Sequence, residues 1–271
     1  MHPFEILKHT PKTNCGQCGH PTCLAFAAAV AKTGADVHRC PYIKTDGLKL
    51  ASPVVDDLDD IARQHDLALI EHLKEKTATL DLPAIAAGLG AETDHNEPDV
   101  LRFKYLGRRI FFSKTDISME GAPLIDPRDQ ILLYNYVYSS GGRTPDNNWI
   151  GMESLPNSIS KIKTLARYCE EKLAPCLAGL SQNNLQTIIN KLDATVEADP
   201  TATLALTVPV LPMIPERIIF WAEEPEEKFP AKVKILFDQF VLDFLDLESL
   251  VFTAERMAEH IIELAKAQTG D

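Results

Sequence analysis

The chain has 271 residues, of which 45% are hydrophobic and 24% charged, a composition typical of a globular protein that buries a core. Its formal net charge of −12 argues against non-specific binding of nucleic acid or anionic lipid, because binding either of them needs a basic protein surface. No apolar run approaches the roughly 20 residues of a membrane helix and the first ten residues lack a signal peptide's apolar stretch, so we expect a cytoplasmic protein without membrane insertion.

Near the N-terminus, four of the six cysteines stand close together in the chain: Cys15, Cys18, Cys23 and Cys40. They follow the spacing C-x2-C-x4-C-x16-C, and a proline comes directly after the fourth cysteine. Gly16 and Gly19 allow the backbone to wrap closely around an inorganic core, with N–H groups left free to point at sulfur. Three thiols on one loop and a fourth from farther along the chain are a usual way to hold a [4Fe–4S] cluster, so the pattern favours such a cluster.

Two other interpretations of these cysteines remain open. A structural zinc ion is usually bound by two short knuckles, and the sequence offers only the pair Cys15 and Cys18. Four incidental thiols are the third possibility. The stretch 1–45 is also locally basic, with five Lys or Arg against two Asp or Glu, and cations close to thiolates are electrostatically favourable.

The first part of the chain is expected to be helical outside the cysteine loop. Thr22 can cap a helix that runs to about Lys32, with Gly34 just past its end. Residues 45–55 have the composition of a linker. Apolar residues recur at helical spacing over about 56–77, and a short helix is expected over 82–89.

The rest of the chain mixes strand and helix patterns. Apolar residues alternate over 101–105 and return at 110 and 112, which predicts a hairpin that turns at Gly107-Arg108. The Asp126-Pro127 pair is a typical helix start. Helices are expected over 128–139, 158–175, 183–195 and 247–267, and strands over 203–208, 217–221 and 233–237.

Helices and strands are segregated in this order rather than strictly alternating, which favours an α+β fold over a doubly wound sheet. We therefore predict two domains. A small loop-helix [4Fe–4S] module occupies residues 1–45, and a larger α+β domain with a mainly antiparallel sheet occupies residues 56–271.

The cysteine stretch resembles a known domain. Residues 11–27 read PKTNCGQCGHPTCLAFA and, with the closing Cys40-Pro41, closely resemble the small N-terminal [4Fe–4S] domain of the large subunit of corrinoid iron–sulfur proteins. The same domain occurs in the B subunit of the Rnf electron-transport complex. The resemblance covers about residues 8–43 and implies that the four cysteines are the cluster ligands. In those families the domain delivers low-potential electrons to a neighbouring site. The corrinoid protein uses these electrons to reactivate its cobalt by reduction.

The larger part of the chain resembles the family called domain of unknown function 3786, which often follows this cluster domain in anaerobes. The similar stretches are ILLYNY at 131–136, NWI at 148–150 with LP at 155–156, and FPA at 229–231 with ILFD at 235–238. This second resemblance implies no particular chemistry.

Two weaker motifs involve ligand-type residues. Asp36-Val37-His38 matches the start of a D-x-H-x-x-G corrinoid motif, but Pro41 stands where the glycine is required, so we reject it. Cys169 and Cys176 would share one face of a helix. We interpret them as buried free thiols rather than a redox pair, because two helical turns separate them by more than a disulfide spans.

Two further features have a functional and a structural interpretation. One set of residues could line a flat pocket for a planar cofactor, although aromatic residues at helical spacing more often belong to a core: Tyr134, Tyr138, Arg143 and Trp149. The acidic run Glu223–Glu227 is interpreted as a solvated loop, with a docking patch for a basic partner as the alternative.

These observations predict an iron–sulfur protein that binds one [4Fe–4S] cluster and transfers single electrons in anaerobic metabolism. Its expected partner is a redox protein, such as a ferredoxin or a corrinoid protein. One alternative is a corrinoid-binding protein that takes part in methyl transfer, and another is a non-redox scaffold with a structural cluster or zinc. Because no hydrolase, phosphate-loop or dinucleotide signature is present, we expect an electron-transfer or accessory protein rather than a stand-alone enzyme.

Overall fold

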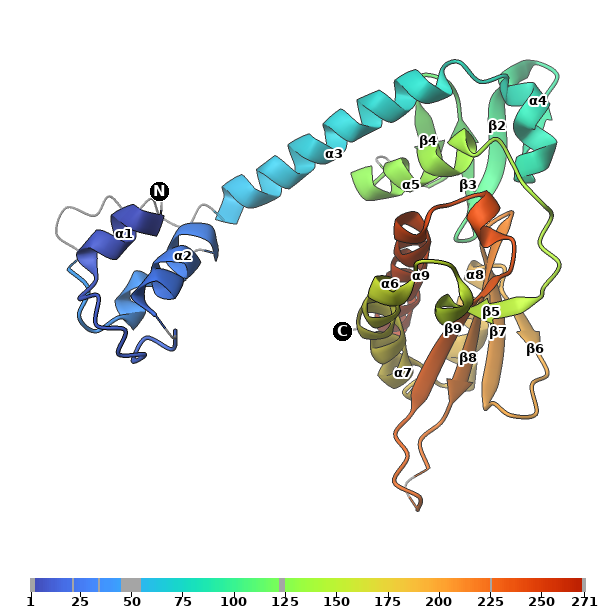
Figure 1. Ribbon diagram of the computed structural model, residues 1–271. Coiled ribbons are helices and arrows are strands. Elements are labelled where there is room, and N and C mark those ends of the chain that lie inside the picture. The colour runs from blue at the N-terminus through green and yellow to red at the C-terminus, as the bar shows by residue number, and fades with distance from the viewer. Residues whose placement is uncertain are drawn as a thin grey trace. The chain divides into compact units, whose positions relative to one another are not determined.

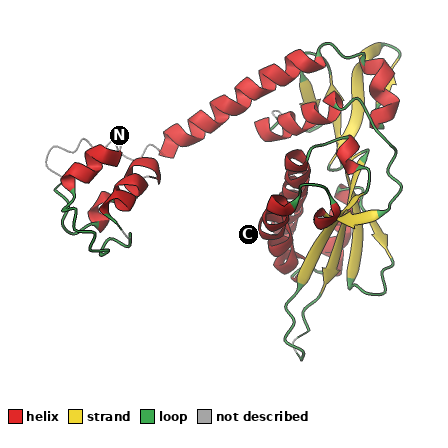
Figure 2. Ribbon diagram, viewed as in Figure 1, coloured by secondary structure: helices red, strands yellow, loops and turns green. Residues whose placement is uncertain are grey.

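The computed structural model describes residues 3–20, 22–33, 35–44, 55–121, 125–224 and 226–269. The expected helix stop at Gly34 and residues 45–54 of the expected linker lie outside these ranges. The chain divides into two compact units, residues 1–64 and 65–271, and the division falls within the helix α3 (Val55–Thr77). Figure 1 labels the elements, and Figure 2 separates helices from strands.

The first unit contains α1 (Pro3–His9), α2 (Cys23–Thr33), the short 3-10 helix η1 (Val37–Arg39) and the beginning of α3. The predicted start of α2 is confirmed, since the Thr22 hydroxyl accepts a hydrogen bond from the Ala25 N–H at 3.0 Å. Helices α1 and α2 pack against each other. The fully buried Phe26 lies at the centre of a small apolar cluster that includes Val30 and Ile43.

The second unit opens with α4 (Leu82–Ala86) and the 3-10 turn η2 (Ala87–Leu89), which together confirm the helix expected over 82–89. A four-stranded antiparallel sheet follows in the order β1-β2-β3-β4. Its strands are β1 (Glu92–Asp94), β2 (Glu97–Tyr105), β3 (Arg108–Phe112) and β4 (Ile117–Met119). The apolar side chains that alternate along β2 and β3 are buried, as the sequence pattern predicts.

The β2–β3 turn lies one residue earlier than expected. Leu106 and Gly107 occupy it with φ of 48° and 77°, and Arg108 is already the first residue of β3. Two consecutive positive φ values are typical of the tight hairpin turn whose twist matches that of the strands. The Leu106 N–H also donates to the Val210 carbonyl at 3.0 Å, which joins this turn to the second sheet.

The second sheet has five antiparallel strands in the order β5-β9-β8-β7-β6. They are β5 (Trp149–Gly151), β6 (Thr195–Glu197), β7 (Leu204–Leu211), β8 (Ile214–Trp221) and β9 (Lys232–Asp238). The three long strands were expected, and the short edge strands β5 and β6 were not. The β8 strand is the middle strand of this sheet, and most of its side chains are buried.

Helices complete the second unit. They are α5 (Pro127–Tyr138), η3 (Met152–Ser154), α6 (Ile159–Leu165), the π-helical turn η4 (Ala166–Glu170), α7 (Glu171–Ala178), α8 (Gln182–Lys191), η5 (Val241–Asp243) and α9 (Leu247–Thr269). The long helix α9 packs against α5, α6, α7 and α8. The Asp126 carboxylate caps α5 by accepting from the Arg128 N–H at 2.9 Å, as the Asp-Pro start predicts.

The fold is α+β, as the order of elements indicates, but it holds two separate antiparallel sheets where we expected one. Among the described helices, none combines the length and the apolar character needed to cross a membrane.

Candidate metal centre

The backbone of the cysteine loop bends repeatedly. Lys12, Asn14, Gly16 and Gly19 all have positive φ, between 51° and 84°. The Gly19 N–H donates to the Gly16 carbonyl at 2.9 Å, which closes a tight turn between them. Gly16 and Gly19 are therefore required for the loop's shape, as expected from the sequence.

A side-chain hydrogen bond closes the loop on the helix that follows it. The Asn14 Oδ1 accepts from the backbone N–H of Cys23 at 2.8 Å. This bond holds the residue before Cys15 against the first residue of α2. Cys15, Cys18 and Cys23 therefore lie on one closed turn of chain, with Cys23 as the first residue of α2.

Three of the four thiols are buried, and one is exposed. Cys18, Cys23 and Cys40 are each less than a tenth exposed, whereas Cys15 faces solvent. Cys18 and Cys40 belong to the same small apolar cluster as Phe26. Cys40 directly follows η1, and this 3-10 turn places it in the same apolar cluster as Cys18.

The structure does not gather the four sulfur atoms around a common point. Within the described part of the chain, no three His, Cys, Asp or Glu side chains form a group that could hold a metal ion. The donor set nevertheless fits an iron–sulfur cluster, because four thiols are available, three of them are shielded from water, and two of these pack with Phe26.

Hydrogen-bond donors and a cation surround the loop. The Gln17 N–H and the Thr13 hydroxyl lower the pKa of Cys15, and thiolate is the form that binds metals. The Arg39 guanidinium lies beside the loop, since its Nη2 is 3.9 Å from where a Cβ on Gly19 would be. The neighbouring Asp36 has a structural role, because its carboxylate accepts from the His38 N–H at 2.9 Å and caps η1.

The two remaining cysteines lie in the second unit as free thiols. Cys169 is completely buried in the π-helical turn η4, and Cys176 is partly buried in α7. Burial raises the pKa of Cys169 far above its usual range, and the nearby Glu216, Glu255 and Glu170 carboxylates raise it further. A thiol of this kind is unreactive, which agrees with its interpretation as part of the core.

The four residues weighed as the lining of a planar pocket have separate partners, so this alternative to a core role is not formed. Tyr134 is buried with its ring edge-on to Phe112, at 5.1 Å between centroids. Tyr138 is exposed beneath the Lys76 ammonium. Trp149, on β5, lies next to Arg217, and Arg143 pairs with Asp243, whose pKa it lowers to about 2. Tyr134 therefore belongs to the core, as the structural interpretation predicts, whereas Tyr138 does not.

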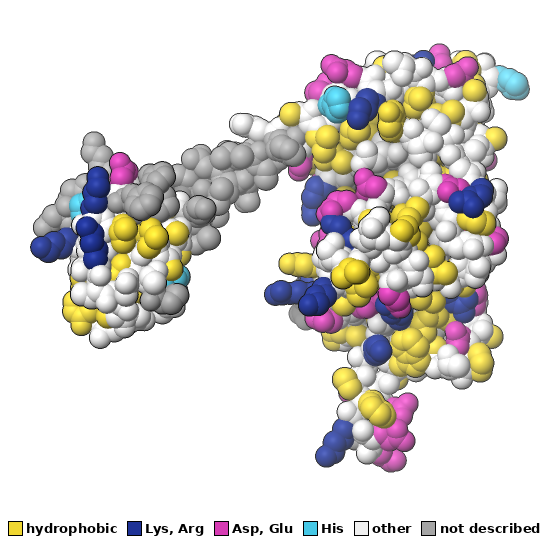
Figure 3. All heavy atoms as spheres, in the orientation of Figure 1, with side chains coloured by type: hydrophobic (Ala, Val, Ile, Leu, Met, Phe, Trp, Pro, Cys, Tyr) yellow, Lys and Arg dark blue, Asp and Glu magenta, His cyan; other side chains and the backbone are white. Residues whose placement is uncertain are grey.

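The acidic run forms the exposed end of the hairpin between β8 and β9, where Figure 3 shows a group of acidic side chains. Glu224 and Phe229 bridge its two arms through backbone hydrogen bonds. This is the solvated loop expected from the sequence. Its Pro225 lies outside the described residues.

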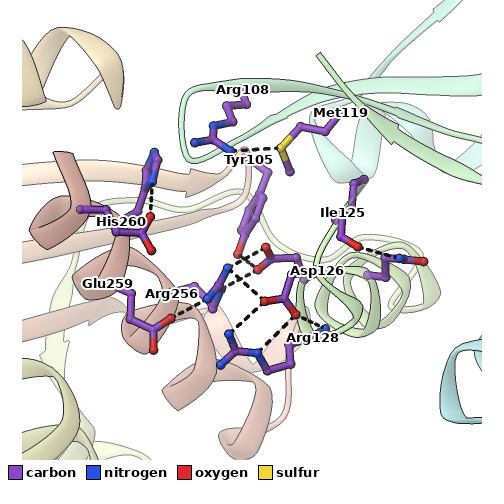
Figure 4. Close-up of polar contacts among 12 residues, drawn as sticks. Tyr105, Arg108, Met119, Ile125, Asp126, Arg128, Arg256, Glu259 and His260 are labelled. Atoms are coloured by element: carbon purple, nitrogen blue, oxygen red, sulfur yellow. Dashed lines mark hydrogen bonds and ion pairs between the residues drawn. The ribbon is translucent and has the colours of Figure 1, made fainter. Parts of the chain in front are cut away.

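One polar cluster was not anticipated, and Figure 4 shows it. The Asp129 carboxylate in α5 accepts from the Tyr105 hydroxyl in β2 at 2.8 Å. It also receives two hydrogen bonds from Arg256 in α9, at 2.7 and 2.9 Å. These three residues are far apart in the sequence and match no short motif, so only the folded chain brings them together.

Comparison with known proteins identifies the class of the first unit and then the family of the chain. Residues 11–42 match the family described as "Putative Fe-S cluster", so this segment is that of an iron–sulfur protein. Residues 81–260 match the family described as "Domain of unknown function (DUF3786)". That match covers more than half of the chain, and the chain belongs to this family.

Three curated proteins illustrate the similarity. The corrinoid/iron–sulfur protein large subunit of Moorella thermoacetica is 56% identical over 40 residues, which are 15% of this chain and 9% of that protein. The acetyl-CoA decarbonylase/synthase complex subunit gamma 2 of Methanosarcina mazei is 25% identical over 171 residues, 61% of this chain and 32% of that protein. The B subunit of the ion-translocating oxidoreductase complex of Thiobacillus denitrificans is 49% identical over 39 residues, 14% of this chain and 21% of that protein.

The chain therefore spans about a third or less of the length of these relatives. No solved structure matches the chain.

Proposed function

We propose that the chain binds one [4Fe–4S] cluster through Cys15, Cys18, Cys23 and Cys40. On this proposal the chain passes single electrons to a protein partner in anaerobic one-carbon metabolism. The observation that carries the proposal is the closed cysteine loop. The Asn14–Cys23 hydrogen bond holds three of the cysteines on one turn of chain, and Cys40 packs with Cys18 against Phe26.

The residues around the loop suit this role. A bound cluster supplies a one-electron redox centre whose potential depends on hydrogen bonds to sulfur and on nearby charge. Here the Gln17 N–H and the Thr13 hydroxyl already donate to the Cys15 sulfur, and Arg39 adds a positive charge beside Gly19. Both features stabilise added negative charge, so they favour the reduced state.

The named relatives support a protein partner. Two of them are subunits of complexes by name, the decarbonylase/synthase and the ion-translocating oxidoreductase, and a third is the large subunit of a corrinoid/iron–sulfur protein. The stretch 1–45 carries five basic against two acidic residues, while the rest of the chain is strongly acidic. We infer that the partner docking on the first unit is itself acidic, as a ferredoxin would be.

Metal analysis of the protein purified without oxygen tests the cluster directly. We expect about four iron and four sulfide per chain. The Cys23→Ala variant should lose them because it removes a ligand, whereas the Cys169→Ala variant, which removes a thiol buried in the second unit, should keep them. Stoichiometric zinc without sulfide, or equal iron in the two variants, would refute the proposal.

The absorption spectrum of the same sample separates the two alternatives. A bound corrinoid would add its own bands and favour a role in methyl transfer. The similarity to the Moorella protein gives this alternative no support outside the cysteine segment, because it covers 40 residues only. A metal centre that resists every reductant would instead favour the scaffold.

A further inference from the structure

The polar cluster of the second unit borders a small pocket of about 60 Å³. Its walls come from elements far apart in the chain. Arg108 and Met119 belong to the four-stranded sheet, Asp129 to α5, and Arg256 and His260 to α9. Figure 4 shows these side chains around the Tyr105 ring. All the residues that line the pocket belong to the second unit.

The base of the pocket is an ion pair. Asp129 accepts one hydrogen bond from Tyr105 and two from Arg256, and it is less than a tenth exposed. The remaining guanidinium nitrogen of Arg256, Nη1, donates to Glu259 at 2.5 Å. Arg256 is therefore already paired with two carboxylates, and Asp129 is paired with Arg256 and Tyr105.

Two groups at the pocket are not satisfied in this way. The only contact of the Arg108 guanidinium among the described residues is a weak hydrogen bond to the Met119 sulfur at 3.7 Å, and no carboxylate within the described ranges pairs with it. His260 faces the same space from α9, with its side chain 12% exposed and Glu263 3.7 Å from its Nδ1. Arg108, which is exposed, therefore borders the pocket without a carboxylate partner among the described residues, and Glu263 is the carboxylate beside His260.

The charges around His260 act on its pKa in both directions. Burial lowers the pKa of His260, and the positive charges of Arg108 and Arg256 lower it further, against the opposite effect of Glu263. The other charged or titratable groups at the pocket are Tyr105, Asp129 and Glu259. Asp129 and Glu259 are engaged with Arg256, and Glu263 stands beside His260 with its side chain 71% exposed. An anion from solution would therefore give Arg108 a partner and compete with Glu263 for His260.

We propose that this pocket binds a small planar oxyanion of the carboxylate class between the Arg108 guanidinium and the His260 ring. A guanidinium favours such ions because its parallel N–H groups match their two oxygens. The volume also fits, since a water molecule needs about 10–15 Å³ by this measure, and the pocket therefore holds an ion of about four heavy atoms. Binding takes up a proton on His260 and therefore strengthens as the pH falls below the pKa that the ring has in the bound state.

The test is an NMR titration of the His260 ring in the complete chain, with its signal assigned from the His260→Gln variant. Acetate and bicarbonate are the two probes, because an organic acid and dissolved carbonate present the same planar oxyanion. Sodium chloride at equal ionic strength is the control. We expect a saturable shift with millimolar acetate or bicarbonate, a raised pKa for His260 in the bound state, and no such change with chloride.

Two neighbouring arginines provide a matched pair of variants. Arg108→Gln removes the guanidinium at the pocket and should weaken binding about tenfold or more, as expected for the loss of a charged hydrogen-bond donor. Arg109→Gln makes the same change on the next residue of β3, which borders a different pocket with Phe103, and should leave binding unchanged. The proposal is overturned if neither anion gives a saturable shift, if chloride acts like them, or if the two variants bind equally. It does not depend on the metal centre, so either proposal can fail alone.

Discussion

Glu216 places a carboxyl group at the middle of the five-stranded sheet, with no exposed surface. Its Oε1 accepts a hydrogen bond from the Thr253 hydroxyl of α9, and its Oε2 has no hydrogen-bond partner among the described residues. Burial raises the pKa of Glu216 to about 8, and the Thr253 hydrogen bond only partly offsets this. The folded protein therefore holds Glu216 mostly protonated at neutral pH, whereas the unfolded chain ionises it near 4.5.

This difference makes stability depend on pH. Between about pH 5 and 8 the folded state binds more protons at Glu216 than the unfolded state does, so its contribution to the free energy of unfolding decreases as the pH rises. The slope attributable to one group is at most about 1.4 kcal/mol per pH unit. Glu216→Gln keeps an acceptor for Thr253 but cannot ionise, and should remove this slope.

Denaturant unfolding at several pH values between 5 and 8 measures the effect. His260 has a lowered pKa and acts in the opposite direction, but it is common to both proteins and cancels in the comparison. Glu227→Gln, at the exposed end of the β8–β9 hairpin, is the control and should behave like the unmodified chain. An unchanged slope in Glu216→Gln would show that this carboxyl is not protonated in the folded protein.

At the level of elements, the β2–β3 turn has a strict requirement for glycine. Gly107 has φ of 77°, and a Cβ at this position would lie 2.0 Å from the Lys191 carbonyl oxygen. The close neighbour is backbone, so no side chain can move aside to make room. The turn also donates through Leu106 to Val210 of β7, so a shift here would disturb the junction of the two sheets.

Gly107→Ala should therefore lower the free energy of unfolding by about 2–4 kcal/mol, measured by denaturant unfolding. Gly121→Ala is a matched control, because Gly121 has φ of 75° but nothing within 4 Å of the added Cβ. That variant should lose about 1 kcal/mol only, the cost of the backbone conformation, because the clear space is that left by the described residues. Equal losses in the two variants would mean that the contact with Lys191 does not exist.

The long strands and helices could be predicted from the sequence, and the strands of three residues could not. Strands β7, β8 and β9 have seven or eight residues with apolar patterns, and the long helices have clear starts such as Asp126-Pro127. Strands β1, β4, β5 and β6 have three residues each, too few to show alternation. They exist because longer neighbouring strands offer them a hydrogen-bonding edge, which is a property of the fold.

The candidate sites divide in the same way. The cysteine loop was predictable because its residues lie close in the sequence and its spacing is unusual. The pocket at Arg108 and His260 was not, because its residues come from β3 and α9 and each is unremarkable in its own segment. The planar pocket weighed as an alternative for Tyr134 and Trp149 is not formed. Tyr134 belongs to the core, as helical spacing of aromatic residues more often indicates.

For the whole molecule, we propose that residues 1–45 fold as a separate module that depends on its metal. The described apolar cluster around Phe26 is small, and so short a segment cannot bury much apolar surface. Binding of a metal centre to such a segment is part of its folding free energy. The second unit has its own extensive core and needs no such help.

Removal of the metal by a chelator should therefore disorder the first unit and leave the second folded. Hydrogen exchange read by mass spectrometry measures both parts in one sample. We expect peptides from residues 5–44 to lose protection, while those from β7, β8 and β9 keep it. Simultaneous loss of protection in both parts would place the domain boundary elsewhere.

On the proposed function, the first unit exchanges single electrons with acidic protein partners, and it takes them up from a donor such as a ferredoxin before it passes them on. Stopped-flow reduction of the metal-loaded chain by a reduced ferredoxin, across a range of salt concentrations, tests it most directly. The rate should fall as salt rises, because salt screens the attraction of a basic surface for an acidic partner. Lys12→Glu, in the cysteine loop, should slow reduction at low salt, whereas Lys163→Glu, on α6 of the second unit, should not. A cluster that ferredoxin fails to reduce at any salt concentration, or a rate that salt and Lys12→Glu leave unchanged, would contradict this account.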